Sequence, residues 1–244
     1  MAERALHHRF FALAGTQPTR PALRGERCAL TAGELAHQAL QTATVLTERG
    51  VGCGRPVGIS VRDTSRCVSA ALGVLAAGGC CIPLAWDLTA SRQECLLCNN
   101  GAFLALTDQP TPAAPPTVDP TPQDSTEPYD TAPIWNIAQL PFTLSEKASP
   151  LRPSPARRGG RAAWIYPDPA RPVRPARVLT HGDIARAAEH LTGYNSRPRE
   201  MRLRIPCSSP LWPYAVLPAL ASGIPLLVPA REPAAAQRPA AVHL

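Results

Sequence analysis

The first 108 residues alternate between two patterns, a helical repeat of apolar positions and short continuous apolar runs. The helical repeat predicts helices over residues 32–49, 65–77 and 90–98. The apolar runs predict buried strands over residues 56–61, 80–84 and 103–107. Because strands and helices of these lengths follow one another in turn, we expect an α/β fold with a mostly parallel sheet flanked by helices.

The first of these helices carries a clear start signal. Thr31 and Glu34 have the spacing of a capping box, in which each side chain accepts a hydrogen bond from the other residue's backbone amide. Gly50 marks the end of the same helix. Residues 1–15 have no apolar signal core, so we expect an ordinary N-terminal helix in a cytoplasmic protein, with a mitochondrial presequence as the alternative.

Residues 109–160 differ in character, since they contain 12 of the 29 prolines. Proline lacks an amide donor and fixes its φ angle, so neither a helix nor a sheet is expected to propagate there. We therefore predict a proline-rich linker or insertion, whose one apolar patch at 134–144 docks on the folded domain. This divides the chain into an N-terminal subdomain at 1–108, the linker at 109–160, a second α/β segment at 161–230 and a loose tail at 231–244.

The second α/β segment repeats the alternation seen before the linker. It predicts a strand at 162–166, a helix from Thr180 to about residue 192, a strand at 202–206, a helix at 214–221 and a strand at 224–228.

Composition narrows the candidate functions. The net charge is +7, and all basic residues except Lys147 are arginine. Few aromatic residues lie among the arginines and no recognition motif is present, so nucleic-acid binding is disfavoured.

No apolar run reaches the ~20 residues that span a bilayer. The pair Cys95 and Cys98 has no second ligand pair at a zinc-finger spacing, which favours packing over a metal site.

Three ordered segments carry a resemblance to a known family. They are ALTAGEL at 29–35, GVGCGRPV at 50–57 and AALGVLAAGGCCIPL at 70–84. In this order and at this spacing they resemble the front part of the adenylate-forming (AMP-binding) superfamily, which includes acyl-CoA synthetases and the adenylation domains of nonribosomal peptide synthetases. The resemblance implies a partial adenylate-forming fold and an AMP-dependent ligase chemistry.

The resemblance also locates a phosphate loop, and this chain departs from it there. In the family a strand ending in tyrosine leads to TSGSTGxPKGV, and a Thr-His pair then opens a helix; here those flanks are Tyr166 and Thr180 with His181. The family's Thr, Ser and Gly positions hold PDPARP at 167–172, and Pro175 stands at the lysine position. Four prolines remove four amide donors from a cradle that needs them. The degenerate loop leaves these candidate phosphate-binding residues: Tyr166, Asp168, Arg171, Arg174, Arg177, Thr180 and His181.

Further family features are absent from this sequence. Pro210 occupies the position of the aspartate that contacts the substrate amine in amino-acid-activating members, and the catalytic lysine has no counterpart. No residue is therefore assigned a catalytic role, and ATP with Mg²⁺ is expected only if the loop keeps its function. We expect a truncated relative, leaning toward no enzyme activity of its own, with a carrier protein or a complementary synthetase chain as its partner. Two alternatives stay open: one half of a split acid-activating enzyme, and a basic Pro/Arg-rich interaction module.

Overall fold

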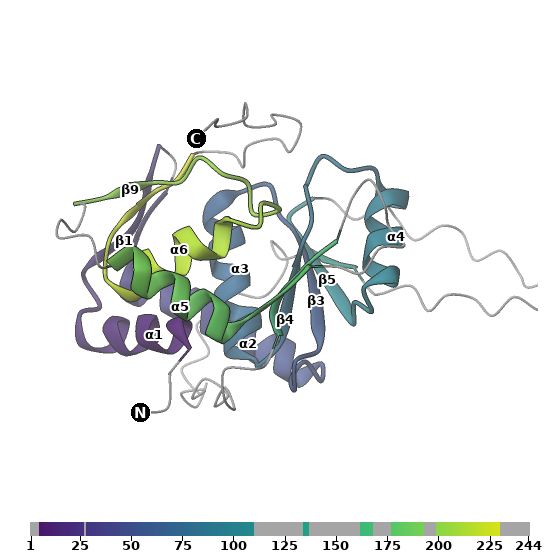
Figure 1. Cartoon of the computed structure of the whole chain (residues 1–244), viewed down its shortest axis with the longest axis horizontal. Coiled ribbons are helices and arrows are strands. Elements are labelled where there is room, and N and C mark those ends of the chain that lie inside the picture. Colours follow the sequence, from purple (N-terminus) through teal and green to yellow (C-terminus); the bar gives the residue numbers. More distant parts are fainter. Residues whose placement is uncertain are drawn as a thin grey trace, which may run out of the picture.

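The structure is a computed structural model of the chain. It describes residues 5–26, 28–109, 134–136, 162–167, 177–192 and 199–229. Within them the helices lie between two sheets and around their edges (Figure 1).

The smaller sheet has four strands in the order β2-β1-β10-β9. Strand β1 (Pro21–Gly25) forms an antiparallel pair with β2 (Cys28–Thr31) and a parallel pair with β10 (Leu226–Leu227). Strand β9 (Met201–Arg202) pairs in parallel with β10 and lies at the edge. The register sets Leu23 beside Leu226, so the two ends of the chain build one sheet.

The larger sheet has six strands in the order β6-β5-β3-β4-β7-β8. Strands β3 (Pro56–Ser60), β4 (Cys80–Pro83) and β5 (Leu104–Thr107) come from the first part of the chain. Strand β7 (Ala162–Tyr166) pairs in parallel with β4, and β8 (Arg177–Thr180) returns antiparallel to β7. The parallel sheet expected from the sequence is therefore present, with one antiparallel strand at its edge.

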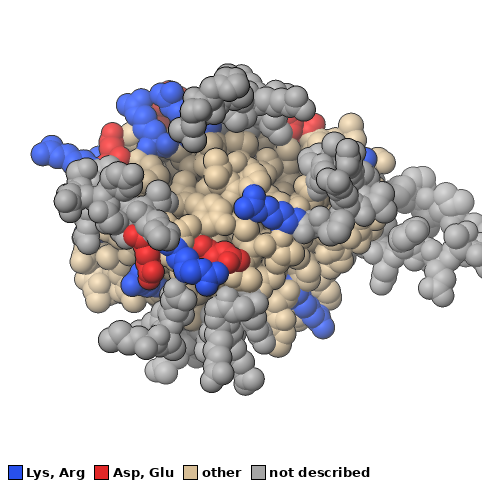
Figure 2. All heavy atoms as spheres, viewed as in Figure 1, with Lys and Arg blue, Asp and Glu red and all other residues tan. Residues whose placement is uncertain are grey.

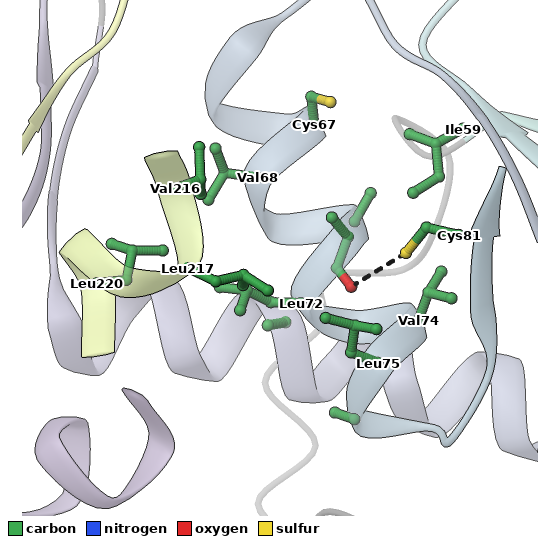
Figure 3. Close-up of a cluster of buried hydrophobic side chains, with 14 of the residues drawn as sticks. Ile59, Cys67, Val68, Leu72, Val74, Leu75, Cys81, Val216, Leu217 and Leu220 are labelled. Atoms are coloured by element: carbon green, nitrogen blue, oxygen red, sulfur yellow. Dashed lines mark hydrogen bonds between the residues drawn. The ribbon is translucent and has the colours of Figure 1, made fainter. Parts of the chain in front are cut away.

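Helices α2 (Ala32–Glu48), α3 (Thr64–Ala76) and α6 (Trp212–Ala221) lie between the two sheets, and α4 (Ala90–Asn99) covers the outer face of the larger one (Figure 1). Every residue of α3 except Ser65 and Arg66 is buried, which explains its almost continuous apolar sequence. Figure 3 shows Val216 and Leu217 of α6 directed at Val68 and Leu72 of α3. The helix α3 is thus the centre of the core.

Two helices complete the molecule: α1 (Leu6–Thr16) and α5 (His181–Thr192). Helix α1 packs on α6 and α2 and also contacts α5. A helix is present near the N-terminus, as the sequence predicted. Within the described part of the chain, no helix combines the length and apolar character needed to cross a membrane.

Some predicted element bounds were wrong. The strand expected over 202–206 is limited to Met201 and Arg202, because the chain turns at 207–209 and Pro206 has no amide to continue a ladder. Helix α6 starts two residues earlier than expected, at Trp212, since a proline near the first helical position fits the helix start.

The expectation of no strand within 109–160 was also wrong at one place. Strand β6 (Ile134–Asn136) pairs in parallel with β5, placing Ile134 beside Ala105. These three residues begin the apolar patch that was expected to dock on the domain. The rest of that patch and of the proline-rich segment lies outside the described residues.

Candidate phosphate-loop site

A β-hairpin frames the candidate site. Strands β7 and β8 pair so that Tyr166, the last residue of β7, lies opposite Arg177, the first residue of β8. Residues 167–176 connect the two ends. Because β7 runs parallel to β4, this connection leaves from the carboxyl edge of the parallel strands, where open α/β sheets bind their ligands. The segment identified from the sequence as a degenerate phosphate loop therefore begins at such an edge.

Tyr166 belongs to the core rather than to an exposed site. Its side chain is 5% exposed, and its hydroxyl makes no hydrogen bond to the described residues. Burial raises the pKa of the hydroxyl, and the nearby thiols of Cys207, Cys81 and Cys67 raise it further. Tyr166 is thus a neutral, buried anchor at the start of the loop.

Thr180 and Asp183 form a capping box at the start of α5. The backbone amide and the hydroxyl of Thr180 donate to Asp183 Oδ2 at 2.9 and 2.7 Å, and the amide of Asp183 donates to Thr180 Oγ1 at 3.1 Å. The other carboxylate oxygen accepts from Arg186 at 2.6 Å. These bonds occupy the Thr180 hydroxyl in holding the helix start.

His181 packs against the N-terminal helix. Its ring centroid lies 5.2 Å from that of His7, which is itself 4.3 Å from His8. Burial lowers the pKa of His181 to about 4, and His8 lowers it as well. A neutral imidazole at this position adds no positive charge for a phosphate.

Of the four remaining candidates, the structure describes one. Asp168, Arg171 and Arg174 lie outside them, so their positions are not assigned. Arg177 is exposed on β8 and could meet an anion in solution as a fork of donors. The site residues that the structure does describe therefore supply one exposed cation, a buried phenol and a capped helix start.

Two features at strand ends were not anticipated from the sequence. Asp108, which follows β5, accepts from the backbone amides of Arg62 and Asp63 at 2.9 and 2.8 Å and so joins the carboxyl ends of β5 and β3. An acidic residue directly after a predicted strand was the available signal. The second feature is an open groove of about 690 Å³ at the ends of β1 and β10 and along β9, lined by Arg24, Gly25, Glu26, Glu200, Arg202, Leu203, Arg204, Leu227, Val228 and Pro229.

The other positions considered in the sequence are Pro210 and the pair Cys95 and Cys98. Pro210 lies in the turn before α6, where it offers no carboxylate to a substrate amine. Cys95 and Cys98 are half-buried on α4, and in the described residues no three His, Cys, Asp or Glu side chains are arranged so that they could hold a metal ion. On the face shown in Figure 2, basic side chains gather near β9, and a group of both acidic and basic side chains lies in the region of α5.

Comparison with known proteins establishes the family. The model of the AMP-binding enzyme family matches residues 10–175, which is more than half of the 244 residues. The chain belongs to the AMP-binding enzyme family. Its match includes the strands β3, β4, β5 and β7 that lead to the loop.

The curated relatives that the chain matches include a synthetase and a synthase. The pyochelin synthetase PchE of Pseudomonas aeruginosa is 39% identical over 117 residues, which is 48% of this chain and 8% of that protein. The phenyloxazoline synthase MbtB of Mycobacterium tuberculosis is 36% identical over 102 residues, 42% of this chain and 7% of that protein. The chain therefore matches a small part of these relatives.

Solved structures give the same fold. The nonribosomal peptide synthetase FmoA3 superposes with a TM-score of 0.75 at 24% identity, covering 93% of this chain and 23% of that one. The N-terminal subdomain of Klebsiella oxytoca NpsA, in complex with 3-hydroxybenzoyl-AMSN, superposes with a TM-score of 0.71 at 19% identity. That match covers 94% of this chain and 54% of the subdomain. The fold is that of the N-terminal part of adenylate-forming enzymes.

Proposed function

We propose that this chain is an adenylation-domain-like scaffold that does not activate a carboxylic acid with ATP on its own. The observation that carries the proposal is the loop between Tyr166 and Arg177, which keeps the framing hairpin of a phosphate loop while its connecting sequence contains four prolines and no Gly, Ser or Thr. Phosphate cradles depend on backbone amides that approach the oxygens closely. Each proline removes one such donor.

Charge alone does not restore the missing cradle. Arginines in and beside the loop attract phosphate as donors on long side chains, whereas catalysis of phosphoryl or adenylyl transfer requires positioned groups. Among the flanking residues, Thr180 is committed to its capping box and His181 to packing against His7. Loose association with a nucleotide is therefore compatible with the proposal, and productive positioning is not.

A thermal melt with and without ATP and Mg²⁺ tests this proposal. A ligand present at 100 times its dissociation constant stabilises the folded state by about 2.7 kcal/mol, which raises Tm by roughly 5–10 °C in a domain of this size. We expect no such rise for this chain. A rise of this size that requires Mg²⁺ as well as ATP, or ATP–pyrophosphate exchange driven by a carboxylic acid, would show that the loop still works.

A loop graft provides the matched control. Replacing residues 167–172 with Thr-Ser-Gly-Ser-Thr-Gly and making the changes Arg174→Pro, Pro175→Lys and Ala176→Gly restores the family pattern from the first Thr to the Gly after Lys in the same loop. If the loop sequence is the cause, the graft gains an ATP-dependent rise in Tm while the parent chain shows none. If neither binds ATP, the defect lies outside the loop.

We propose a carrier protein or a synthetase subunit as the partner of such a scaffold. The support is that its relatives include large synthetases such as PchE and that a solved neighbour is an artificially fused adenylation–PCP di-domain of NpsA and ThdA.

The open edge of β9 favours a second candidate, in which another chain completes an acid-activating enzyme. The amides of Met201 and Leu203 donate to Pro225 and Leu227 at 2.9 and 2.8 Å, which uses the side of β9 that faces β10. No described strand pairs with its other side. Because an unpaired edge is a template for strand addition, a complementary chain could extend the sheet there.

The substitution Arg202→Pro tests strand addition at this edge. In β9 the amides of Met201 and Leu203 point toward β10, so the Arg202 amide between them points to the open side. Proline at residue 202 therefore removes a hydrogen-bond donor from the open side. Arg202→Ala is the control, since it removes the same charge and keeps the amide. Co-elution with a complementary synthetase chain should be lost with proline and retained with alanine. Equal co-elution of both variants would exclude β9 as the contact.

A further inference from the structure

Three imidazoles meet where α1 contacts α5. His7 and His8 belong to α1, and His181 is the first residue of α5. The ring centroids are 4.3 Å apart for His7 and His8 and 5.2 Å apart for His7 and His181. Figure 1 shows the two helices side by side in the lower left of the molecule, in agreement with their printed contacts. The cluster is thus a junction between the N-terminus and the element that follows the loop.

His7 is the buried centre of the cluster. Its side chain is 1% exposed, and neither ring nitrogen has a hydrogen-bond partner within the described part of the chain. A buried polar group without a partner costs free energy, and a buried charge without a partner costs considerably more. The site therefore tolerates a neutral imidazole and rejects an imidazolium.

Among the described residues, no carboxylate acts electrostatically on the His7 ring. The groups that act on His7 electrostatically are His8 and His181, both of which become cations. On the helices that pack against α1, Glu34 of α2 and Asp183 of α5 are engaged in their capping boxes. His37 and Glu48 of α2 and Arg186 and Glu189 of α5 are exposed, and the titratable groups on α3 and α6 are Arg66, the thiol of Cys67 and the phenol of Tyr214.

We propose that His7, His8 and His181 form a pH-sensitive latch that holds α1 against α5 when the imidazoles are neutral and releases it when they are protonated. Protonation of one ring introduces a buried charge, and protonation of a second places two like charges about 5 Å apart. Both effects oppose docking. The latch does not depend on whether the loop binds ATP.

The direction of the pH dependence follows from the lowered pKa values of His7 and His181. Burial lowers the pKa of His7 well below 6.5 and that of His181 to about 4. Since the docked state binds protons less readily than the released state, its stability is complete above pH 6.5 and decreases as the pH falls toward 4. The lower pKa of His181 in the docked state links proton binding to release of α1. This effect of His181 alone should decrease the equilibrium constant for docking of α1 on α5 by roughly tenfold or more between pH 7.5 and 5.0.

Hydrogen exchange of the full chain at pH 7.5 and 5.0 tests the latch. After correction for intrinsic rates, amide protection in α1 should fall at least tenfold at pH 5.0, while protection in α3 should change less than threefold. Two variants remove the switch in different ways: His7→Leu fills the site with an apolar group, and His181→Asn removes the second ring. In either variant that folds, α1 protection should become nearly independent of pH.

The exposed His37 provides the matched control, because His37→Gln removes a histidine from α2 without changing the cluster. This variant should keep the wild-type pH dependence. NMR titration of the histidine ring carbons of the wild-type chain gives a measurement that needs no variant, and His7 should titrate well below the ordinary histidine pKa. A normal midpoint for His7, equal loss of protection in α1 and α3, or an unchanged pH dependence in His7→Leu would each overturn the proposal.

Discussion

Two helices of this chain begin with the same arrangement of four residues. Thr31 and Glu34 start α2, and Thr180 and Asp183 start α5; in both, the threonine amide donates to the carboxylate and the threonine oxygen accepts in return. These hydrogen bonds from the threonine amides and hydroxyls lower the pKa of both carboxyl groups. In each capping box, these hydrogen bonds therefore stabilise the first turn of the helix.

Replacing Thr180 with alanine should destabilise the protein by about 1 kcal/mol, because an amide at the helix start loses its acceptor. Thr31→Ala should have a similar effect at α2, and the serine variants should retain most of the stability. Urea unfolding at neutral pH measures these differences.

Acid should reduce the same differences, because a protonated carboxyl group no longer accepts both threonine hydrogen bonds as an anion. The stability that each carboxylate contributes is present above its unfolded pKa of about 4 and is lost as the pH falls through its lowered folded value. A cost of Thr180→Ala that is equal at pH 7 and pH 3 would contradict this role.

The close approach of α2 and α3 depends on one glycine. A methyl group at Gly73 would lie 2.7 Å from the Cβ of Thr42 and 2.9 Å from the carbonyl oxygen of Ala39. Gly73→Ala should therefore destabilise the chain by about 1–3 kcal/mol despite the better helix propensity of alanine. Gly15→Ala in α1 is the control, since nothing lies within 4 Å there, and it should stabilise by about 0.5–1 kcal/mol. Thermal or urea unfolding of both variants checks the opposite signs.

At the scale of elements, α3 packs between the two sheets. Leu72 is 1% exposed and faces Leu217 of α6 in Figure 3, whereas Leu211, just before α6, is 63% exposed. We expect Leu72→Ala to cost about 2–5 kcal/mol through lost burial and the cavity left behind. Leu211→Ala should change stability by less than about 0.5 kcal/mol. Similar costs in urea unfolding would mean that α6 does not pack on α3 as described.

The elements that the sequence predicted well are those with a strong local signal. Neighbouring residues specify the conformation of three such elements. They are α2 with its capping box at Thr31, α3 with its apolar sequence, and β4 with its continuous run of buried residues. Strands β1, β2 and β8 were not predicted, because they are short and half-exposed and owe their pairing to distant partners. Strand β6 was not predicted either, because it has three residues, lies in a proline-rich segment and pairs with the distant β5.

The candidate site was predictable only in part. The sequence located the loop between Tyr166 and Thr180, and the hairpin of β7 and β8 agrees with that placement. It could not show that His181 meets His7, since this contact joins residues from opposite ends of the chain. Nor did periodicity reveal the groove beside β9, which exists only when β1, β9 and β10 lie side by side.

At the scale of the whole molecule, one continuous core serves both sheets. Leu23 of the smaller sheet, Ile59 and Trp164 of the larger one and Trp212 of α6 belong to the same cluster. The rings of Trp164 and Trp212 are 6.0 Å apart. We expect the two sheets to unfold in one cooperative transition, with tryptophan fluorescence and far-UV circular dichroism giving coincident curves in urea. Separate midpoints would show that the sheets are independent units.

The central position of β10 in the smaller sheet has a consequence during protein synthesis. Arg20, just before β1, donates to the carbonyl of Gly223, and the two residues are 203 positions apart. At about 5–20 residues per second, a ribosome needs roughly 10–40 s to make the intervening chain. Throughout that interval β1 lacks its partner on one side, and the apolar face of α1 lacks α6. The newly made N-terminal segment should therefore depend on molecular chaperones until the last strand leaves the exit tunnel.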